Sequence, residues 1–199
     1  MTHLIQYFTQ HPEVDAIGGK IHPDYQSQEP KWMSKYLLPL IAALDMGNSP
    51  KPFTGSKFPI GANMAFRREV FSTREPFRTN LGRKGDFLGS GEEKDFFIRL
   101  KKQGKTIHYV PTVQVKHYIS DRRLEKAYIK RMAQGIGVSE AIRIQSGPFT
   151  EVLQKWISEF FKIGATLILA FVYAVRGQWS KGSMLIKFRL WLLSSFIKG

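Results

Sequence analysis

The chain has 199 residues, of which 43% are hydrophobic and 13% aromatic. This length allows one domain with its own core, or a compact domain plus an appendage, and the composition excludes disordered and fibrous classes. Thirty lysines and arginines against sixteen acidic residues give a net charge of +14, which favours anionic partners: nucleic acid, phosphorylated substrates or an acidic membrane surface. Cysteine is absent, which excludes disulfides and cysteine-ligated zinc.

The beginning of the chain predicts a helix followed by strands. A short helical spacing ends at Pro12, and the apolar run over residues 14–21 is typical of a buried strand. Residues 60–66 are a second strand candidate, and a helix that leads directly into a strand indicates an α/β fold. Between them, residues 24–59 are rich in Pro, Gly, Ser and Lys around an apolar stretch that starts at Trp32. This pattern predicts a loop and helix covering a site.

The clearest predicted helix starts near Ser90. Ser90 can cap it with Glu93 three residues later, and a glycine follows its basic last turn. Residues 106–110 and 113–117 then predict two strands on either side of a proline. A further helix is predicted from about residue 120 to 143 by apolar residues at a spacing of four.

The composition changes after residue 146, which divides the chain into a domain over 1–146 and a helical segment over 147–199. Within the segment, residues 163–175 form a nearly unbroken apolar run, too short for the about 20 residues that a membrane span needs. Charged residues just upstream, and basic residues among the apolar ones at 184–197, predict helices that lie on an anionic membrane surface. The alternative is a helical hairpin packed on its own domain.

Three carboxylates open the helix that starts near Ser90. Glu92, Glu93 and Asp95 lie in its first turn, where the positive end of the helix dipole favours an ionised acid. Transfer of a sugar with inversion needs one such carboxylate to take the proton of the acceptor hydroxyl. The alternative is structural, because Ser90 and Glu93 also match an ordinary capping box.

Four motifs follow one another in an order that resembles family 2 glycosyltransferases of the GT-A fold. They are Gly-Ala-Asn-Met-Ala-Phe-Arg-Arg at 61–68, Gly-Ser-Gly-Glu-Glu-Lys-Asp-Phe-Phe-Ile-Arg-Leu at 89–100, Tyr-Val-Pro at 109–111 and Val-Lys-His at 115–117. The resemblance spans roughly residues 1–145. Within the family, the chain resembles the bacterial members that build polysaccharides. It implies the acceptor-side half of a Rossmann-like, mixed-sheet domain.

In that family a Gly-Glu-Asp-like motif opens the acceptor-side helix, and its second acid is the catalytic base. The resemblance therefore implies that Glu93 is the base. This chain has Glu where the family more often has Asp, so the choice between Glu93 and Glu92 stays open. Asp95, in the same turn, is a candidate for substrate binding.

Five further residues are candidates for substrate or metal contacts, each with a structural alternative. The resemblance implies that His117 approaches a metal or the donor diphosphate, whereas a purely structural histidine is as plausible. Arg122 and Arg123 can hold phosphate oxygens or be solvated at a helix start. Asn63 can bind a sugar or satisfy a neighbouring loop. Trp32 can stack on a sugar or belong to the core.

One element of the family is not found in the sequence. Members place a nucleotide-binding half before this region, ending in an Asp-x-Asp motif that holds a divalent metal, Mg or Mn. These 199 residues contain no Asp-x-Asp, and Glu13-Val14-Asp15 is the nearest approximation. We therefore expect the metal to be bound mainly by residues outside this sequence, and the isolated chain to be an inactive fragment of the enzyme.

The resemblance implies an inverting glycosyltransferase that uses a nucleotide-sugar donor and a glycan or lipid-linked acceptor. With the basic helical segment, it predicts a peripheral location at the cytoplasmic face of the plasma membrane. Two alternatives remain: a catalytically inactive membrane-associated scaffold, and a basic nucleic-acid-binding module. Because helix-turn-helix, ribonucleoprotein and zinc signatures are absent from the sequence, we expect no nucleic acid among the partners.

Overall fold

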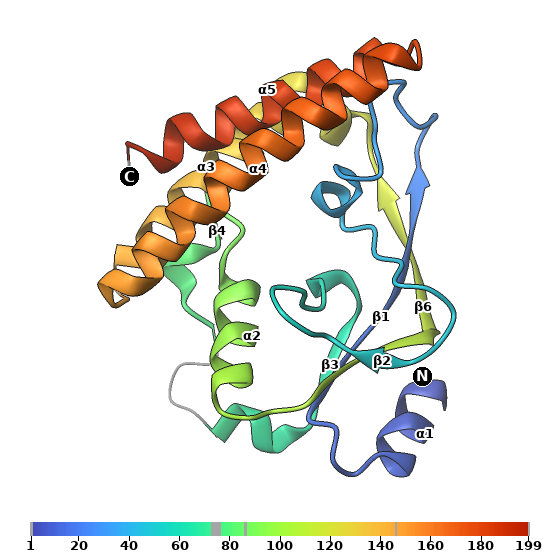
Figure 1. The fold of residues 1–199 in the computed structure, drawn as a ribbon. Coiled ribbons are helices and arrows are strands. Elements are labelled where there is room, and N and C mark those ends of the chain that lie inside the picture. Colours follow the sequence, from blue (N-terminus) through green and yellow to red (C-terminus); the bar gives the residue numbers. More distant parts are fainter. Residues whose placement is uncertain (1, 73–76, 86, 146, 199) are drawn as a thin grey trace. The chain divides into compact units, whose positions relative to one another are not determined.

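The computed structural model describes residues 2–72, 77–85, 87–145 and 147–198, whose fold is drawn in Figure 1. The chain forms two compact units. The sheet unit consists of Met1–Gln26, Pro39–Arg78 and Glu92–Ile119. The helical unit consists of Ser27–Leu38, Thr79–Gly91 and Ser120–Gly199.

Four strands form the sheet in the order β2-β6-β1-β3 (Figure 1). The two long strands, β1 (Ala16–Tyr25) and β6 (Ile107–Ile119), lie in the middle and run parallel. β2 (Lys51–Pro52) pairs antiparallel with β6, and β3 (Met64–Phe66) pairs antiparallel with β1. The sheet is therefore mixed, and the α/β class predicted from the sequence is confirmed.

The predicted break of the last strand at Pro111 is wrong, because β6 runs through it. The pairing register shifts between Gly19 and Lys20, whose partners are Val110 and Gln114. The three skipped residues of β6 form a bulge, where Pro111 needs no N–H to pair with a neighbouring strand. Proline therefore does not end the strand here, because β6 pairs with β1 on both sides of the bulge.

Aromatic packing fixes the helix that carries the acidic turn. α2 (Glu92–Lys102) buries Phe96, Phe97 and Leu100 on one face. The ring of Phe66, on β3, lies 5.5 Å from the rings of both phenylalanines. The other buried members of this core are Ala16, Phe53, Val70, Ile107 and Tyr109. The start of α2 is thereby held beside β3.

Short elements connect the sheet unit. α1 (Thr2–Gln10) packs Tyr7 against Val14, Ile17 and Val110. The predicted strand over residues 60–66 is shorter than expected, because its first half is a 3-10 turn, η2 (Gly61–Asn63). The remaining turns and short strands of the chain are η1 (Leu38–Ile41), η3 (Arg68–Ser72), η4 (Thr79–Leu81), β4 (Arg83–Lys84), β5 (Phe87–Leu88) and η5 (Asp121–Leu124).

Three long helices make up most of the helical unit: α3 (Lys126–Gln145), α4 (Phe149–Val175) and α5 (Trp179–Phe196). In Figure 1 they lie side by side. The core between α3 and α5 is formed by Ala133, Ala141, Ile144, Leu192 and Phe196. The helix predicted to begin near residue 120 begins at Lys126 instead, after the 3-10 turn η5.

The boundary predicted after residue 146 lies outside the described residues and stays a prediction. α3 belongs with α4 and α5 because its small residues let α5 approach closely. A Cβ added to Gly137 would lie 2.3 Å from the carbonyl oxygen of Leu192. The packing partner of the C-terminal helices is thus the preceding helix.

Candidate active site

The carboxylate of Glu93 has a partner on a different element of the sheet unit. α2 begins at Glu92, so Glu93 lies in its first turn, and the side chain reaches η2. Its Oε2 accepts a hydrogen bond of 3.0 Å from the backbone N–H of Gly61. A carboxylate has further lone pairs that can accept a proton. The contact with Gly61 therefore orients the group.

Gly61 leaves room for this carboxylate because it lacks a side chain. A Cβ at this position would lie 1.9 Å from Oε1 and 2.8 Å from Cδ of Glu93, closer than atoms can approach without displacement. Gly61 belongs to the motif at 61–68, but the local sequence does not indicate this role. Its contribution becomes visible only when η2 and α2 are brought together, since the two residues are 32 positions apart.

Asn63 holds the two central strands together at their bulge. Its Nδ2 donates hydrogen bonds of 3.0 Å to the carbonyl oxygens of Lys20 and Val113. Both amide hydrogens are therefore engaged with the backbone. A Cβ on Gly19 would lie 2.2 Å from the same Nδ2, so the amide fills the bulge closely. A sugar contact by Asn63 stays a prediction, and the side-chain oxygen is the atom that would make it.

The other two acids of the turn differ in burial. Asp95 is buried, and its Oδ2 accepts a hydrogen bond of 2.8 Å from Nε of Arg99, with Arg78 at 3.6 Å from Oδ1. These pairs tie Asp95 to the helix and to the segment before it. Glu92 is half-buried. Of the three acids, Glu93 contacts the strand side of the site through Gly61.

The central strands carry the remaining predicted residue of the sheet unit. His117 lies on β6 opposite Pro23 of β1 and is half-buried. The same strand β1 carries Lys20, whose Nζ forms an ion pair with Oδ2 of Asp45 at 2.7 Å. The sequence alone did not indicate this ion pair. The hydrogen bond with Asp45 raises the pKa of Lys20, and the same bond lowers the pKa of Asp45.

Three predicted site residues lie in the helical unit. Trp32 is half-buried in the segment before η1. Arg122 is exposed and Arg123 half-buried within η5. The roles predicted for these three residues in sugar and phosphate binding stay predictions.

The described residues do not form a complete metal site. Among residues 2–72, 77–85, 87–145 and 147–198, no three histidines, aspartates or glutamates lie close enough together to hold an ion. A diphosphate-bound divalent metal therefore does not fit the side chains of the described segments alone. The expectation that other residues supply most of its ligands stays a prediction.

Comparison with known proteins identifies the family. Over 123 residues the chain is 27% identical to glucosyl-dolichyl phosphate glucuronosyltransferase of Haloferax volcanii, covering 61% of this chain and 39% of that protein. No solved structure matches the chain significantly. The profile of glycosyl transferase family group 2 matches residues 2–197 and thus includes the C-terminal helices. The chain therefore belongs to glycosyl transferase family group 2.

Proposed function

We propose that this protein transfers a sugar, with inversion, from a nucleotide-sugar donor to a hydroxyl of a glycan or lipid-linked acceptor. Glu93 is the general base. The observation that carries this proposal is the Glu93 carboxylate at the start of α2, oriented by the N–H of Gly61 at 3.0 Å, in a chain of this family. A base must be positioned before its basicity matters, and this contact supplies the position.

The reaction is a single displacement. Glu93 removes the proton from the acceptor hydroxyl while that oxygen forms a bond to the anomeric carbon of the donor. The bond between the anomeric carbon and the diphosphate oxygen breaks, and the nucleoside diphosphate leaves with the electron pair. The proton stays on Glu93 until solvent takes it. Attack opposite to the leaving group inverts the anomeric centre.

A divalent metal would assist this reaction by neutralising charge on the departing diphosphate. The described residues do not bring together three histidine or acidic side chains that could hold it. Arg122 and Arg123 are the proposed phosphate contacts of this chain, because a guanidinium presents a fixed fork of donors. Trp32, Asn63 and His117 are the proposed contacts to sugar or diphosphate.

A lipid-linked acceptor is proposed for two reasons. The Haloferax volcanii relative is a glucosyl-dolichyl phosphate glucuronosyltransferase, whose name contains a dolichyl-phosphate-linked sugar. In addition, α4 is the one helix of the described residues whose length and apolar composition make it a candidate for membrane contact. We place the enzyme at the cytoplasmic face of the plasma membrane, where a nucleotide sugar and a lipid-linked acceptor can meet.

The test is Glu93→Gln, compared with Glu92→Gln, in the protein as its gene encodes it. Gln keeps an oxygen that can accept the Gly61 N–H but cannot take a proton. Turnover of radiolabelled nucleotide sugars into lipid extract should fall by about 10²- to 10⁴-fold for Glu93→Gln and far less for Glu92→Gln. Equal turnover by Glu93→Gln and the unsubstituted protein contradicts the assignment, and the reverse ranking assigns the base to Glu92.

A further inference from the structure

An unbroken apolar stripe runs along the outer side of α4 from its first residue to its last. Its members recur at spacings of three or four and multiples of these, which places them on one helical face. Each of the following is at least half exposed: Phe149, Leu153, Phe160, Leu167, Phe171 and Val175. At about 1.5 Å per residue, a helix of 27 residues presents a stripe about 40 Å long.

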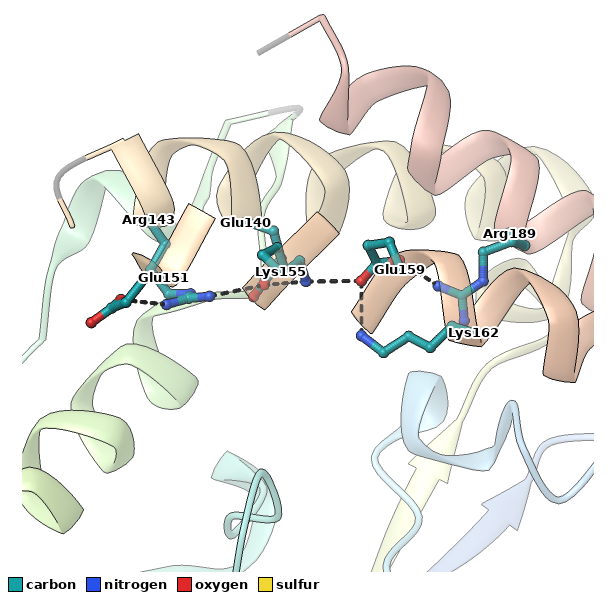
Figure 2. Close-up of polar contacts among 7 residues, drawn as sticks. All are labelled: Glu140, Arg143, Glu151, Lys155, Glu159, Lys162 and Arg189. Atoms are coloured by element: carbon teal, nitrogen blue, oxygen red, sulfur yellow. Dashed lines mark hydrogen bonds and ion pairs between the residues drawn. The ribbon is translucent and has the colours of Figure 1, made fainter. Parts of the chain in front are cut away.

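The acidic and basic side chains of α4 lie on the other side, in a network centred on the buried Glu159 (Figure 2). The Glu159 side chain is 2% exposed, and its Oε1 lies 3.0 Å from Nζ of Lys155 and 2.8 Å from Nζ of Lys162. Its Oε2 accepts a hydrogen bond of 2.9 Å from Nη1 of Arg189 on α5. Lys155 also lies 2.6 Å from Oε2 of Glu140 on α3. One network thus joins three helices.

In residues 147–199, both glutamates lie beside basic side chains. Seven lysines and arginines against two glutamates give residues 147–199 a net charge of +5. Glu159 is enclosed in the network, and Glu151 faces Arg143 at 4.0 Å. Arg176, Lys187 and Lys198 are exposed. The segment therefore combines an apolar face with exposed positive charge.

A bilayer with anionic lipid is the partner that matches both properties. An exposed apolar surface of this length is unusual for a monomeric soluble protein and marks an interaction site. Trp156 and Trp179 are exposed, 45% and 69%, and tryptophan favours the membrane–water boundary. The basic residues are attracted to anionic head groups. An uncharged protein groove would offer them no such attraction.

We infer that α4 lies in the plane of an anionic bilayer, with its stripe in the acyl boundary and the Glu159 network turned toward α3 and α5. The inference deepens the proposed membrane location by naming the surface and its orientation. A spanning orientation is disfavoured because the charge-free part, residues 163–175, covers only about 20 Å of the about 30 Å of hydrocarbon. Extending the span upstream would draw Glu159 and Lys155 into it, at a cost.

The absence of native cysteine allows a direct test with single-cysteine variants of the whole chain. Leu153→Cys, Phe160→Cys and Phe171→Cys carry an environment-sensitive fluorophore on the stripe, and Gln154→Cys carries it beside the stripe. Vesicles of phosphatidylcholine with 30% phosphatidylglycerol include brominated lipids of known depth. In the in-plane orientation the three stripe sites are quenched at one common depth, and Gln154→Cys is quenched less.

Two results overturn the inference. A spanning α4 would place the sites at Leu153 and Phe171 about 27 Å apart along the membrane normal. Absence of quenching at every stripe site would show that the stripe is not a lipid surface, whether a second copy or another protein segment covers it. Neither result depends on sugar transfer, so the failure of this inference and the failure of the proposed function are distinguishable.

Two substitutions that introduce a negative charge test the stripe through binding of the protein to vesicles. Phe160→Asp should lower binding to these vesicles at least about tenfold, since it removes a large apolar side chain from the contact. The matched control is Tyr118→Asp, an exposed aromatic residue of β6 in the sheet unit, which should leave binding within twofold. Equal effects of the two substitutions would mean that the loss comes from net charge alone and would contradict the stripe assignment.

Discussion

Gly61→Ala is expected to damage catalysis while leaving the fold intact. The added Cβ would lie 1.9 Å from Oε1 of Glu93, whereas ordinary van der Waals contact starts at 3.4 Å. The carboxylate must therefore retreat by about 1.5 Å, which a flexible side chain can do at little cost in stability. Gly61 is not among the glycines with positive φ, so alanine fits its backbone. A catalytic group misplaced by about 1 Å can cost about 10²-fold in rate.

The expected outcome is thus a fall in kcat of about 10²-fold, equivalent to about 2.7 kcal/mol of transition-state stabilisation. The free energy of unfolding should change by less than about 1 kcal/mol. Initial rates of transfer from a panel of nucleotide sugars by the protein as its gene encodes it, followed by urea unfolding of the same samples, measure both quantities. Gly164→Ala is the matched control, because nothing lies within 4 Å of a Cβ there, and it should leave the rate unchanged.

A second substitution makes the reasoning refutable. Glu93→Asp shortens the side chain by one methylene and withdraws the carboxylate from the new Cβ. The double variant Gly61→Ala/Glu93→Asp should therefore be more active than additivity predicts, with a coupling energy of at least about 1 kcal/mol. Full activity of Gly61→Ala, or strict additivity in the double-mutant cycle, would refute the idea that Gly61 positions Glu93.

Three further outcomes concern polar side chains that are buried or half-buried. Asn63→Ala leaves two strand carbonyls without their donor and should lower the free energy of unfolding by about 1–3 kcal/mol, measured in urea. Burial, and then the charge of His11, lower the pKa of His108. Stability should therefore fall as pH drops from 6.5 toward the lower folded value, and His108→Gln should flatten that part of the curve. Glu159→Gln breaks the three-helix network and should cost about 3–5 kcal/mol, seen as a lower urea midpoint.

Sequence patterns were most informative where one face of an element is buried. The apolar run over residues 14–21 predicted β1, and the apolar face of the acidic helix predicted α2, because burial on a sheet imposes those patterns directly. Pro111 misled the prediction for β6, since proline usually ends a strand. The bulge opposite Gly19 and Lys20 tolerates it, and that bulge depends on the parallel partner β1, which local sequence does not reveal.

The chemistry of the site was only partly accessible from the sequence. Glu93 was identified from its place at a helix start and from the family resemblance. Its contact with Gly61 depends on how β3 and α2 pack, and no local pattern contains that information. Asn63 was identified from the family resemblance, but its two hydrogen bonds to backbone carbonyls required the register of β1 and β6.

Charge shows the same limit in another form. The net charge of +14 could not distinguish among anionic partners, because composition says nothing about which charges are already paired. The structure supplies that information for the C-terminal helices. Glu159 is buried against Lys155, Lys162 and Arg189, and Glu151 lies 4.0 Å from Arg143, so neither acid of α4 belongs to the apolar stripe. An excess of basic residues then remains around an apolar face. This combination favours a lipid surface over a nucleic acid, because phosphates attract basic side chains but do not bind an apolar stripe.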